Sequence, residues 1–271
     1  MVNLDDMIFE VSSEVRLNIL GMLKSSPETV TGISKELDIS MTEASRHVNR
    51  LAQVGLIQKQ SEGDYLITIL GKTVLAQLGP LEFITRHTEY FASHDATGIP
   101  SQFLNRVHEL YGATPTYTSR ANIMKTVEKL GKSIAEAREH YECIFDESAM
   151  ELVLYADPDP EREDRVKSKV SMGLRCRILL PDTVDYDRIH PEAMKEFTAL
   201  HRYENFEFRL LEEVPVFLQM NEKQVSLLAF PDKNKSIDYL GFEATDEHSM
   251  KWCQSLFDYY WELSKPFLSN Q

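Results

Sequence analysis

The sequence predicts two domains of different class: an α+β domain at the N-terminus, built from short helices and a β-hairpin, and an α/β domain at the C-terminus, with a mixed sheet flanked by helices. Two observations lead to this prediction. In residues 12–69, segments with helical spacing of apolar residues give way to two short strand-like runs. From about residue 119, helical and strand-like segments alternate to the end. We expect domains at 1–78 and 119–271, joined by a helical connector over 79–118.

The composition limits the classes of protein to which this chain can belong. The 271 residues suffice for two domains with separate cores, and 42% hydrophobic and 27% charged residues are typical of a globular chain. No apolar run could span a membrane, and the acidic start is unlike a signal peptide. Cys143, Cys176 and Cys253 are widely spaced, which favours reduced core thiols over a zinc site. We therefore expect a cytoplasmic protein with no membrane partner, no metal and no cofactor.

Residues 28–58 contain two short predicted helices joined by a turn. The first, over 29–38, has an apolar face made of Val30, Ile33 and Leu37. The second, over 41–54, is expected to begin after Ser40, because Glu43 stands at the spacing of a capping box. Its buried face is formed by Ala44, Val48 and Leu51. A further helix over 12–24 precedes this pair.

The outer face of the second helix is polar and basic. It carries Thr42, Ser45, Arg46, Asn49 and Arg50. These residue types reach base edges and phosphates, and a short helix, a turn and a second helix with such a face form the helix-turn-helix arrangement. The pattern predicts that this helix enters the major groove of double-stranded DNA. Ser40 would order the helix start, and Lys35 and Lys59 would contact phosphates.

A β-hairpin is predicted directly after the second helix. Residues 56–60 and 65–69 are strand-like and flank a turn that contains Gly63. Gly55 is expected to end the helix with the positive φ of a C-cap. A hairpin that directly follows the second helix of a helix-turn-helix pair is called a wing, and the arrangement is that of a winged-helix domain.

The N-terminal order of elements resembles the ArsR-like winged-helix transcription regulators. The resemblance rests on VSSEVRLNILGMLKSS, ISKELDISMTEASRHVNRLAQVGLI and LITILG, and it covers about the first 75 residues. It implies a DNA-binding regulator. The Cys/His metal box of metal-sensing members is missing from the second helix, where His47 stands alone, so metal sensing is not implied.

The charge balance opposes simple DNA binding. The net charge is −14, and residues 1–70 carry six Lys or Arg against ten Asp or Glu. Phosphate contacts from Lys and Arg supply most non-specific affinity for DNA. We therefore expect modest, salt-sensitive binding that depends on a homodimer. The alternative is a winged-helix protein-interaction module that does not bind DNA.

The connector is predicted to be helical over 71–92, with an interruption at Gly79–Pro80. This helix supplies either dimer contacts or packing within its own domain. A second helix is expected over 100–110. Between them, His94 and Asp95 favour an Asx-type turn over a catalytic or metal site, because no nucleophile or third ligand is near them in the sequence.

In the C-terminal domain we expect helices at 120–139, 149–155, up to 172, 191–203 and 246–263, and strands at 141–145, 174–180, 206–211, 215–220, 224–230 and 237–243. This order resembles one half of the phospholipase D fold and, more closely, the regulatory domain of archaeal methanogenesis-regulator-type (filamentation-regulator-like) proteins. The resemblance rests on LGPLEFITRHTEYFASHDATGIP, VSMGLRCRILLP, LLEEVPVFLQMNEKQVSLLAFPDK and LFDYYWE. With the winged helix, it covers nearly the whole chain.

Phospholipase D enzymes need a nucleophilic His with a Lys two residues later. Here Lys223 is present, but Asn221 stands where the His would be, so we expect no enzyme. The domain would sense a small effector or set the geometry of a dimer. An effector is expected near the loops after Phe145, Leu180 and Leu211, with Tyr155 and Arg175 as polar partners. The aromatic side chains of the last helix, Trp252, Phe257, Tyr260 and Trp261, favour a core or a dimer interface over a ligand cage.

Overall fold

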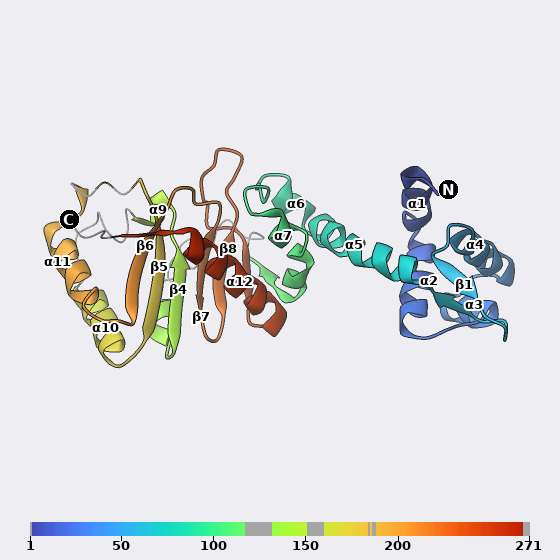
Figure 1. Ribbon diagram of the computed structural model, residues 1–271, viewed down its shortest axis with the longest axis horizontal. Helices are drawn as coiled ribbons and strands as arrows, with labels where there is room; N and C mark the ends of the chain where they lie inside the picture. The colour runs from blue at the N-terminus through green and yellow to red at the C-terminus, as the bar shows by residue number, and fades with distance from the viewer. Residues whose placement is uncertain (1, 117–131, 151–159, 184, 186–187, 268–271) are drawn as a thin grey trace. The chain divides into compact units, whose positions relative to one another are not determined.

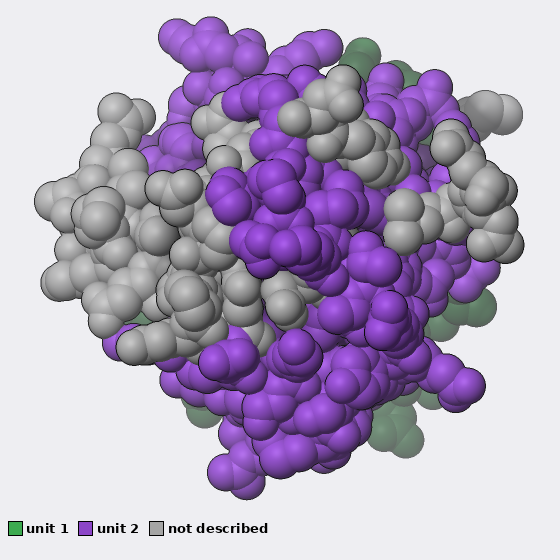
Figure 2. Space-filling view, turned by 90° about the vertical axis from the view of Figure 1, so that its left-hand side faces the viewer, with its two compact units in different colours: residues 1–81 green, residues 82–271 purple. Residues whose placement is uncertain are grey.

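The computed structural model describes residues 2–116, 132–150, 160–183, 185 and 188–267 (Figure 1). Contacts between Cα atoms divide the chain into two compact units, Met1–Leu81 and Glu82–Gln271 (Figure 2). The dividing point lies inside one helix, α5, Ile69–Arg86. The predicted interruption at Gly79–Pro80 does not end this helix, which continues through Pro80.

The first unit contains the predicted helices and hairpin. Its elements are α1 Leu4–Val11, α2 Glu14–Ser25, α3 Val30–Glu36, α4 Met41–Gln53, β1 Ile57–Lys59, β2 Tyr65–Ile67 and the start of α5. Strands β1 and β2 pair antiparallel as the wing. The winged-helix class predicted for this unit is confirmed. Helix α1 was not predicted, although Asn3 and Asp6 form a capping box at its start.

Both ends of α4 have the predicted chemistry. Ser40 Oγ accepts the Glu43 N–H at 3.2 Å, while the Glu43 carboxylate accepts the Ser40 N–H at 3.3 Å. After the helix, Gly55 has φ +77°, a conformation that side chains with a Cβ rarely adopt. The chain can therefore turn directly from α4 into β1.

Hydrogen bonds of Thr68 and the close approach of Gly71 hold the wing against the start of α5. Thr68 Oγ1 donates to the carbonyl of Gly55 at 2.7 Å and accepts the N–H of Gly71 at 3.0 Å, so it caps α5 as well. Gly71 lies against the carbonyl oxygen of Leu56, and a Cβ at this position would overlap that oxygen. The helix can approach the wing this closely only with glycine.

The second unit is built around a mixed sheet, as predicted. In its described part the strand order is β10-β6-β5-β4-β7-β8-β9-β3. These strands are β3 Thr114–Pro115, β4 His140–Ile144, β5 Arg175–Pro181, β6 Phe206–Leu211, β7 Phe217–Asn221, β8 Val225–Ala229, β9 Phe242–Ala244 and β10 Lys265–Pro266. Strands β4, β5 and β6 run parallel, and the other pairs are antiparallel.

Helices cover both faces of the sheet, so neighbouring residues of a strand enter different cores. Leu228 packs in a core with α12, Glu247–Leu263, whereas Leu227 packs in a core with α10, Pro160–Ser171, and α11, Pro191–Leu200. This arrangement explains why β7 and β8 are buried at every position. A short helix, α9, Glu147–Met150, follows β4.

Two predicted elements differ from the structure, and two others are only partly described. The helix expected over 100–110 is split into α7, Ser101–Leu104, and a 3₁₀ helix, Val107–Gly112. The strand expected over 237–243 is limited to β9. Most of the helical stripe expected over 120–139 and part of that over 149–155 lie outside the described residues.

The beginning of the predicted connector packs into the second unit. Helix α6, Thr88–Phe91, carries Tyr90, which is buried in the same core as Phe83, Phe103 and Val107. The hydroxyl of Tyr90 donates to the carbonyl of Leu240 at 3.1 Å and accepts the N–H of Phe230 at 2.9 Å. One side chain thus satisfies two backbone groups at the end of the sheet.

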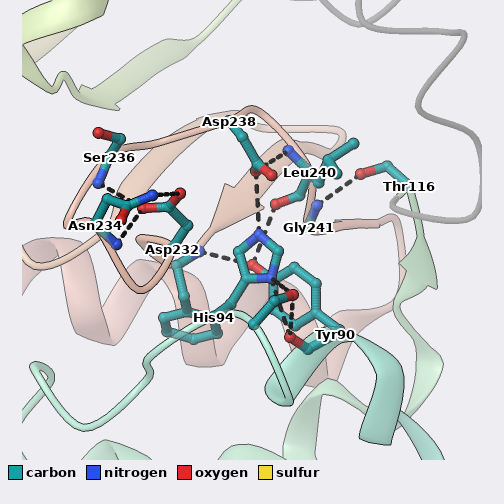
Figure 3. A network of polar contacts seen from close by, with 11 residues as sticks. Tyr90, His94, Thr116, Asp232, Asn234, Ser236, Asp238, Leu240 and Gly241 are labelled. Atoms are coloured by element: carbon teal, nitrogen blue, oxygen red, sulfur yellow. Dashed lines mark hydrogen bonds and ion pairs between the residues drawn. The ribbon is translucent and has the colours of Figure 1, made fainter.

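His94 extends this polar network (Figure 3). Its ring stacks on Tyr90 with centroids 4.0 Å apart, and its Nε2 lies 3.1 Å from the Asp238 carboxylate. Asp95 accepts the N–H of Thr97 at 2.8 Å and the hydroxyl of Thr97 at 2.6 Å, which is the predicted Asx-type turn. His94 therefore holds residues 88–97 to the loop before β9, and Asp95 stabilises the turn that follows His94.

We expect Gly71→Ala to destabilise the first unit by about 1–3 kcal/mol, because the new methyl group meets a backbone carbonyl that cannot move aside cheaply. Gly21→Ala in α2 is the matched control, since open space surrounds that position, and it should stabilise the helix by about 0.5–1 kcal/mol. Urea unfolding of the full chain, followed by hydrogen exchange in residues 2–81, measures both. Equal stability of the two variants would contradict the close approach.

We expect Tyr90→Phe to destabilise the second unit by about 1–3 kcal/mol, because two buried backbone groups lose their partner while the ring packing is kept. Tyr111→Phe is the control: Tyr111 is 61% exposed, and its hydroxyl pairs with Arg86 at the surface, a contact that contributes little to the free energy of unfolding. Urea unfolding of the two variants compares them. A wild-type stability for Tyr90→Phe would show that water replaces the hydroxyl.

Candidate nucleic-acid interface

The polar face of α4 forms a shallow groove. Its lining consists of Met41, Thr42, Ser45, Arg46, Asn49, Arg50 and Gln53. The groove gathers the five residues predicted for this helix face and adds Met41 and Gln53. These two were missed because one is apolar and the other lies in the last turn, although Gln53 follows Asn49 by four residues and so continues the same face.

The orientation of α4 follows from its opposite face. Ala44, Val48 and Leu51 are fully buried in the core of the first unit. Side chains three and four residues apart lie on one side of a helix, so burying these three turns Thr42, Asn49 and their neighbours outward. The apolar stripe therefore decides which side chains can meet a ligand.

The other predicted contacts lie outside this groove. Ser40 is the N-cap of α4, as predicted, and its hydroxyl is engaged in the capping box. Lys35 in the last turn of α3 and Lys59 at the end of β1 are exposed. Neither lysine belongs to the groove lining, and their role remains a prediction.

The two arginines of α4 have different surroundings. Arg46 is exposed and makes no hydrogen bond or ion pair with a described residue. Arg50 donates to the carboxylate of Glu10 in α1, with Nε 3.1 Å and Nη2 2.6 Å from Oε1. Its guanidinium also lies over the ring of Phe9, with the carbon atom Cζ 4.8 Å from the ring centroid.

Glu10 is the buried centre of this cluster. Its side chain is 8% exposed and also pairs with Arg16, whose Nε lies 3.0 Å from Oε2. Hydrogen bonds from Arg50 lower the pKa of the Glu10 carboxyl, and the charges of Arg16 and Arg50 act in the same direction, while burial opposes them. The carboxylate is therefore charged at neutral pH and offsets part of the positive charge of the two arginines.

His47 lies on α4 beside the groove residues Arg46 and Arg50. It is half-buried, and its Nδ1 is covered without a hydrogen-bond partner among the described residues. Burial lowers the pKa of His47, and the neighbouring Arg16 and Arg46 lower it further. The neutral imidazole is thus favoured at neutral pH, so His47 adds no full charge to the groove.

The sites predicted in the second unit are not brought together. Arg175 is exposed at the start of β5, whereas Leu180 and Leu211 lie near the ends of parallel strands β5 and β6. The first residues of parallel strands lie at one end of the sheet, and the last residues lie at the opposite end. Arg175 therefore cannot share a site with the loops after Leu180 and Leu211. Tyr155 lies outside the described residues.

The aromatic side chains of α12 belong to the core. Trp252 and Phe257 are fully buried, and Tyr260 and Trp261 nearly so, in agreement with the predicted core role. Arg177 lies over Phe257 and Trp261 and pairs with the buried Glu142. These contacts tie α12 to the centre of the sheet.

Asn221 is also structural. It is fully buried, and its side-chain oxygen accepts the N–H of Lys223 at 2.9 Å and that of Gln224 at 3.2 Å. Its amide donates to the carbonyl of Ser133 at 3.1 Å.

Among the described residues, no group of His, Cys, Asp and Glu is placed to hold a metal ion, and no helix is long and apolar enough to cross a membrane.

Comparison with known proteins finds similarity in two separate parts of the chain. Residues 11–60 match a family model described as a helix-turn-helix domain. Residues 159–263 match the model of the middle domain of methanogenesis regulatory protein FilR1. A protein named methanogenesis regulatory protein FilR1, from Methanothrix harundinacea (strain 6Ac), is 23% identical over 266 residues. The match covers 94% of this chain and 56% of the relative, so the chain spans about half of that protein's length.

Two solved structures are distantly similar to the chain. TrmBL2, an archaeal chromatin protein, is 13% identical, with 97% of this chain and 100% of that chain covered and a TM-score of 0.40. NucT from Helicobacter pylori is 16% identical, with 57% and 97% covered and a TM-score of 0.36.

The matched ranges fall on the two units in the order predicted from the sequence. The first range spans α2 to β1 and includes every residue that lines the groove on α4, and the second spans α10 to α12. The first unit therefore has a winged helix-turn-helix fold, and residues 159–263 of the second unit are similar to the FilR1 middle domain.

Proposed function

We propose that this protein is a sequence-specific, DNA-binding transcription regulator whose α4 enters the major groove. The observation that carries the proposal is the groove on α4, which unites Thr42, Ser45, Arg46, Asn49 and Arg50 on one face. The match of residues 11–60 to a helix-turn-helix domain supports it. Within a major groove, Arg recognises guanine and Asn or Gln recognises adenine through paired hydrogen bonds.

The proposed contacts with DNA are of two kinds, those to base edges and those to phosphates. Asn49 and Gln53 would form hydrogen bonds with base edges, and Met41 would pack against a thymine methyl group. Arg46 is not engaged with a described residue and is free to meet either a base or a phosphate. Ser40 would order the start of α4, and Lys35 and Lys59 would contact phosphates beside the groove.

The charge distribution favours a weak monomeric interaction. The chain is net −14, and Glu10 offsets part of the charge of Arg16 and Arg50. On and beside α4, the described cations without an acidic partner are few (Arg46, Lys35 and Lys59), so two copies of α4 would be needed for useful affinity. We therefore propose a homodimer.

Exposed apolar side chains support this assembly. Most of those in the described part of the chain lie in or beside α1 and in α5: Val2, Leu4, Ile8, Phe9, Ile69, Leu70 and Leu81. Leu4 is 72% exposed and Ile69 is 86% exposed. A second copy of the chain would remove this surface from water.

The second unit would set the dimer geometry or respond to a small effector. Its resemblance to the FilR1 middle domain supports a regulatory role over an enzymatic one. The place of Asn221 supports the same assignment, because its side chain is used by the turn and is not a nucleophile. A winged-helix module that binds only protein remains the second candidate, favoured by the net negative charge.

We expect Arg46→Ala to weaken binding to DNA of any sequence and to reduce the salt slope of log K by about 0.9 if Arg46 meets one phosphate. Lys24→Ala removes the same charge from an exposed position on α2 and should change binding little. Fluorescence anisotropy with the protein's own promoter region, at several salt concentrations, measures both. The regulator proposal fails if wild type does not bind at about 50 mM salt or if Arg46→Ala binds as wild type does.

We expect Asn49→Ala to lower discrimination at one base-pair position by about 1–3 kcal/mol, because a base-edge contact is lost while phosphate contacts remain. Competition with operator variants changed at single positions measures this. A loss of affinity shared equally by all variants would assign Asn49 to the DNA backbone instead.

We expect Leu4→Glu combined with Ile69→Glu to shift the full chain from dimer to monomer, because charges would be buried at the interface. Met172→Glu is the matched control, since Met172 is 75% exposed in the second unit. Sedimentation velocity of the three proteins gives the masses. A monomeric wild type, or an unchanged dimer in the double variant, would remove α1 and α5 from the interface.

A further inference from the structure

Helix α1 presents one buried carboxylate to the outer face of α4. Glu10 Oε1 lies 2.6 Å from Arg50 Nη2 and 3.1 Å from Arg50 Nε, although the two residues are 40 positions apart in the chain. The two N–H groups along one side of the guanidinium thus meet one carboxylate, in the bidentate arrangement typical of strong Arg–carboxylate pairs. An exposed arginine rarely has so well-defined an orientation.

The carboxylate is itself fixed in place. Arg16 donates from Nε to the backbone carbonyl of Glu10 at 2.6 Å and from Nη2 to that of Phe9 at 2.6 Å. These carbonyls belong to the last turn of α1, where backbone acceptors lack partners within the helix. The buried Arg16 therefore caps α1 and, because its Nε also lies 3.0 Å from Glu10 Oε2, holds the carboxylate in place.

The contacts leave one edge of Arg50 available. Nε and one N–H of Nη2 face Glu10, and Phe9 covers one face of the guanidinium. The remaining edge, formed by Nη1 and the second N–H of Nη2, has no hydrogen-bond partner among the described residues. The side chain is 38% exposed and lines the α4 groove, so this edge is accessible to a ligand there.

We propose that Glu10 is a positioning residue that makes Arg50 selective for a paired acceptor in DNA, such as O6 and N7 of guanine. The inference rests on the proposed DNA-binding function. A guanidinium held in one orientation loses little entropy when it meets a correctly placed pair of acceptors, and it gains little from acceptors placed elsewhere. Glu10 also lowers the local positive potential, so the attraction of Arg50 for phosphates in general is reduced.

This role predicts opposite effects on two measurable quantities. Glu10→Gln keeps the size of the side chain but removes its charge and one of its two acceptor oxygens, so it can no longer hold both N–H groups of Arg50. Binding to random DNA should then become tighter, because one negative charge near the phosphates is lost. Discrimination between operator and random DNA should fall by roughly tenfold, with the loss confined to one base-pair position.

The matched control is Glu43→Gln. Glu43 is exposed on α4, the helix of Arg50, and carries the same charge as Glu10, and a Gln at this place of a capping box preserves the cap. This variant should tighten binding to random DNA by a similar factor without changing the discrimination. The comparison separates the orientation of Arg50 from a simple change of charge.

A second variant, Glu10→Asp, guards against loss of folding in Glu10→Gln. It keeps the charge beside Arg16 but draws the carboxylate back from Arg50 by one methylene. Discrimination should fall while affinity for random DNA stays near that of wild type. In an Arg50→Ala background, neither change at position 10 should alter discrimination further, because the group that Glu10 orients is absent.

The experiment uses the full-length protein, fluorescence anisotropy at several salt concentrations, and an operator selected from a random DNA library, with circular dichroism to confirm folding. Folded Glu10→Gln and Glu10→Asp with wild-type discrimination would overturn the inference and leave the proposed function intact. A Glu10 effect that persists in the Arg50→Ala background, or one spread evenly over all base positions, would also overturn it. If wild type binds no DNA sequence, the proposed function fails, and the inference fails with it.

Discussion

Burial of the apolar stripe of α4 is the constraint on which the candidate interface depends. Ala44, Val48 and Leu51 are fully covered, and this fixes the rotation of the helix about its axis. A change in that rotation would expose apolar area, at a cost of about 25 cal/mol for each Å². The polar groove on the opposite side is therefore a consequence of core packing, and its residues can vary without changing the position of the helix.

The electrostatic potential at the α4 groove depends mainly on the charged groups close to it. The net charge of −14 describes the chain as a whole, whereas the potential at α4 is set by Arg46, Arg50, Glu43 and Glu10. At physiological salt, charges more than about 8 Å apart on the surface are largely screened. An acidic chain can thus carry a face suited to DNA, and one buried carboxylate near that face matters more than many distant ones.

Local sequence signals identified the elements whose chemistry lies within a few residues. The capping box of Ser40 and Glu43, the C-cap at Gly55 and the Asx turn at Asp95 were predicted because each partner is at most three residues away. Helix α1 was missed although it has the same capping signal at Asn3 and Asp6. The strand expected over 237–243 was too long, because burial of Ile237 and Leu240 comes from a packed loop and gives the same apolar pattern.

The sequence by itself determined the two fold classes, the outward-facing residues of α4 and the buried role of the aromatic side chains in α12, because periodicity records which face of an element is apolar. The tertiary structure decided the pairing of Arg50 with Glu10 across 40 residues, the packing of Tyr90 and His94 against the loop before β9, and the separation of Arg175 from the strand ends. These contacts depend on how elements pack in space, and no spacing within one element encodes them.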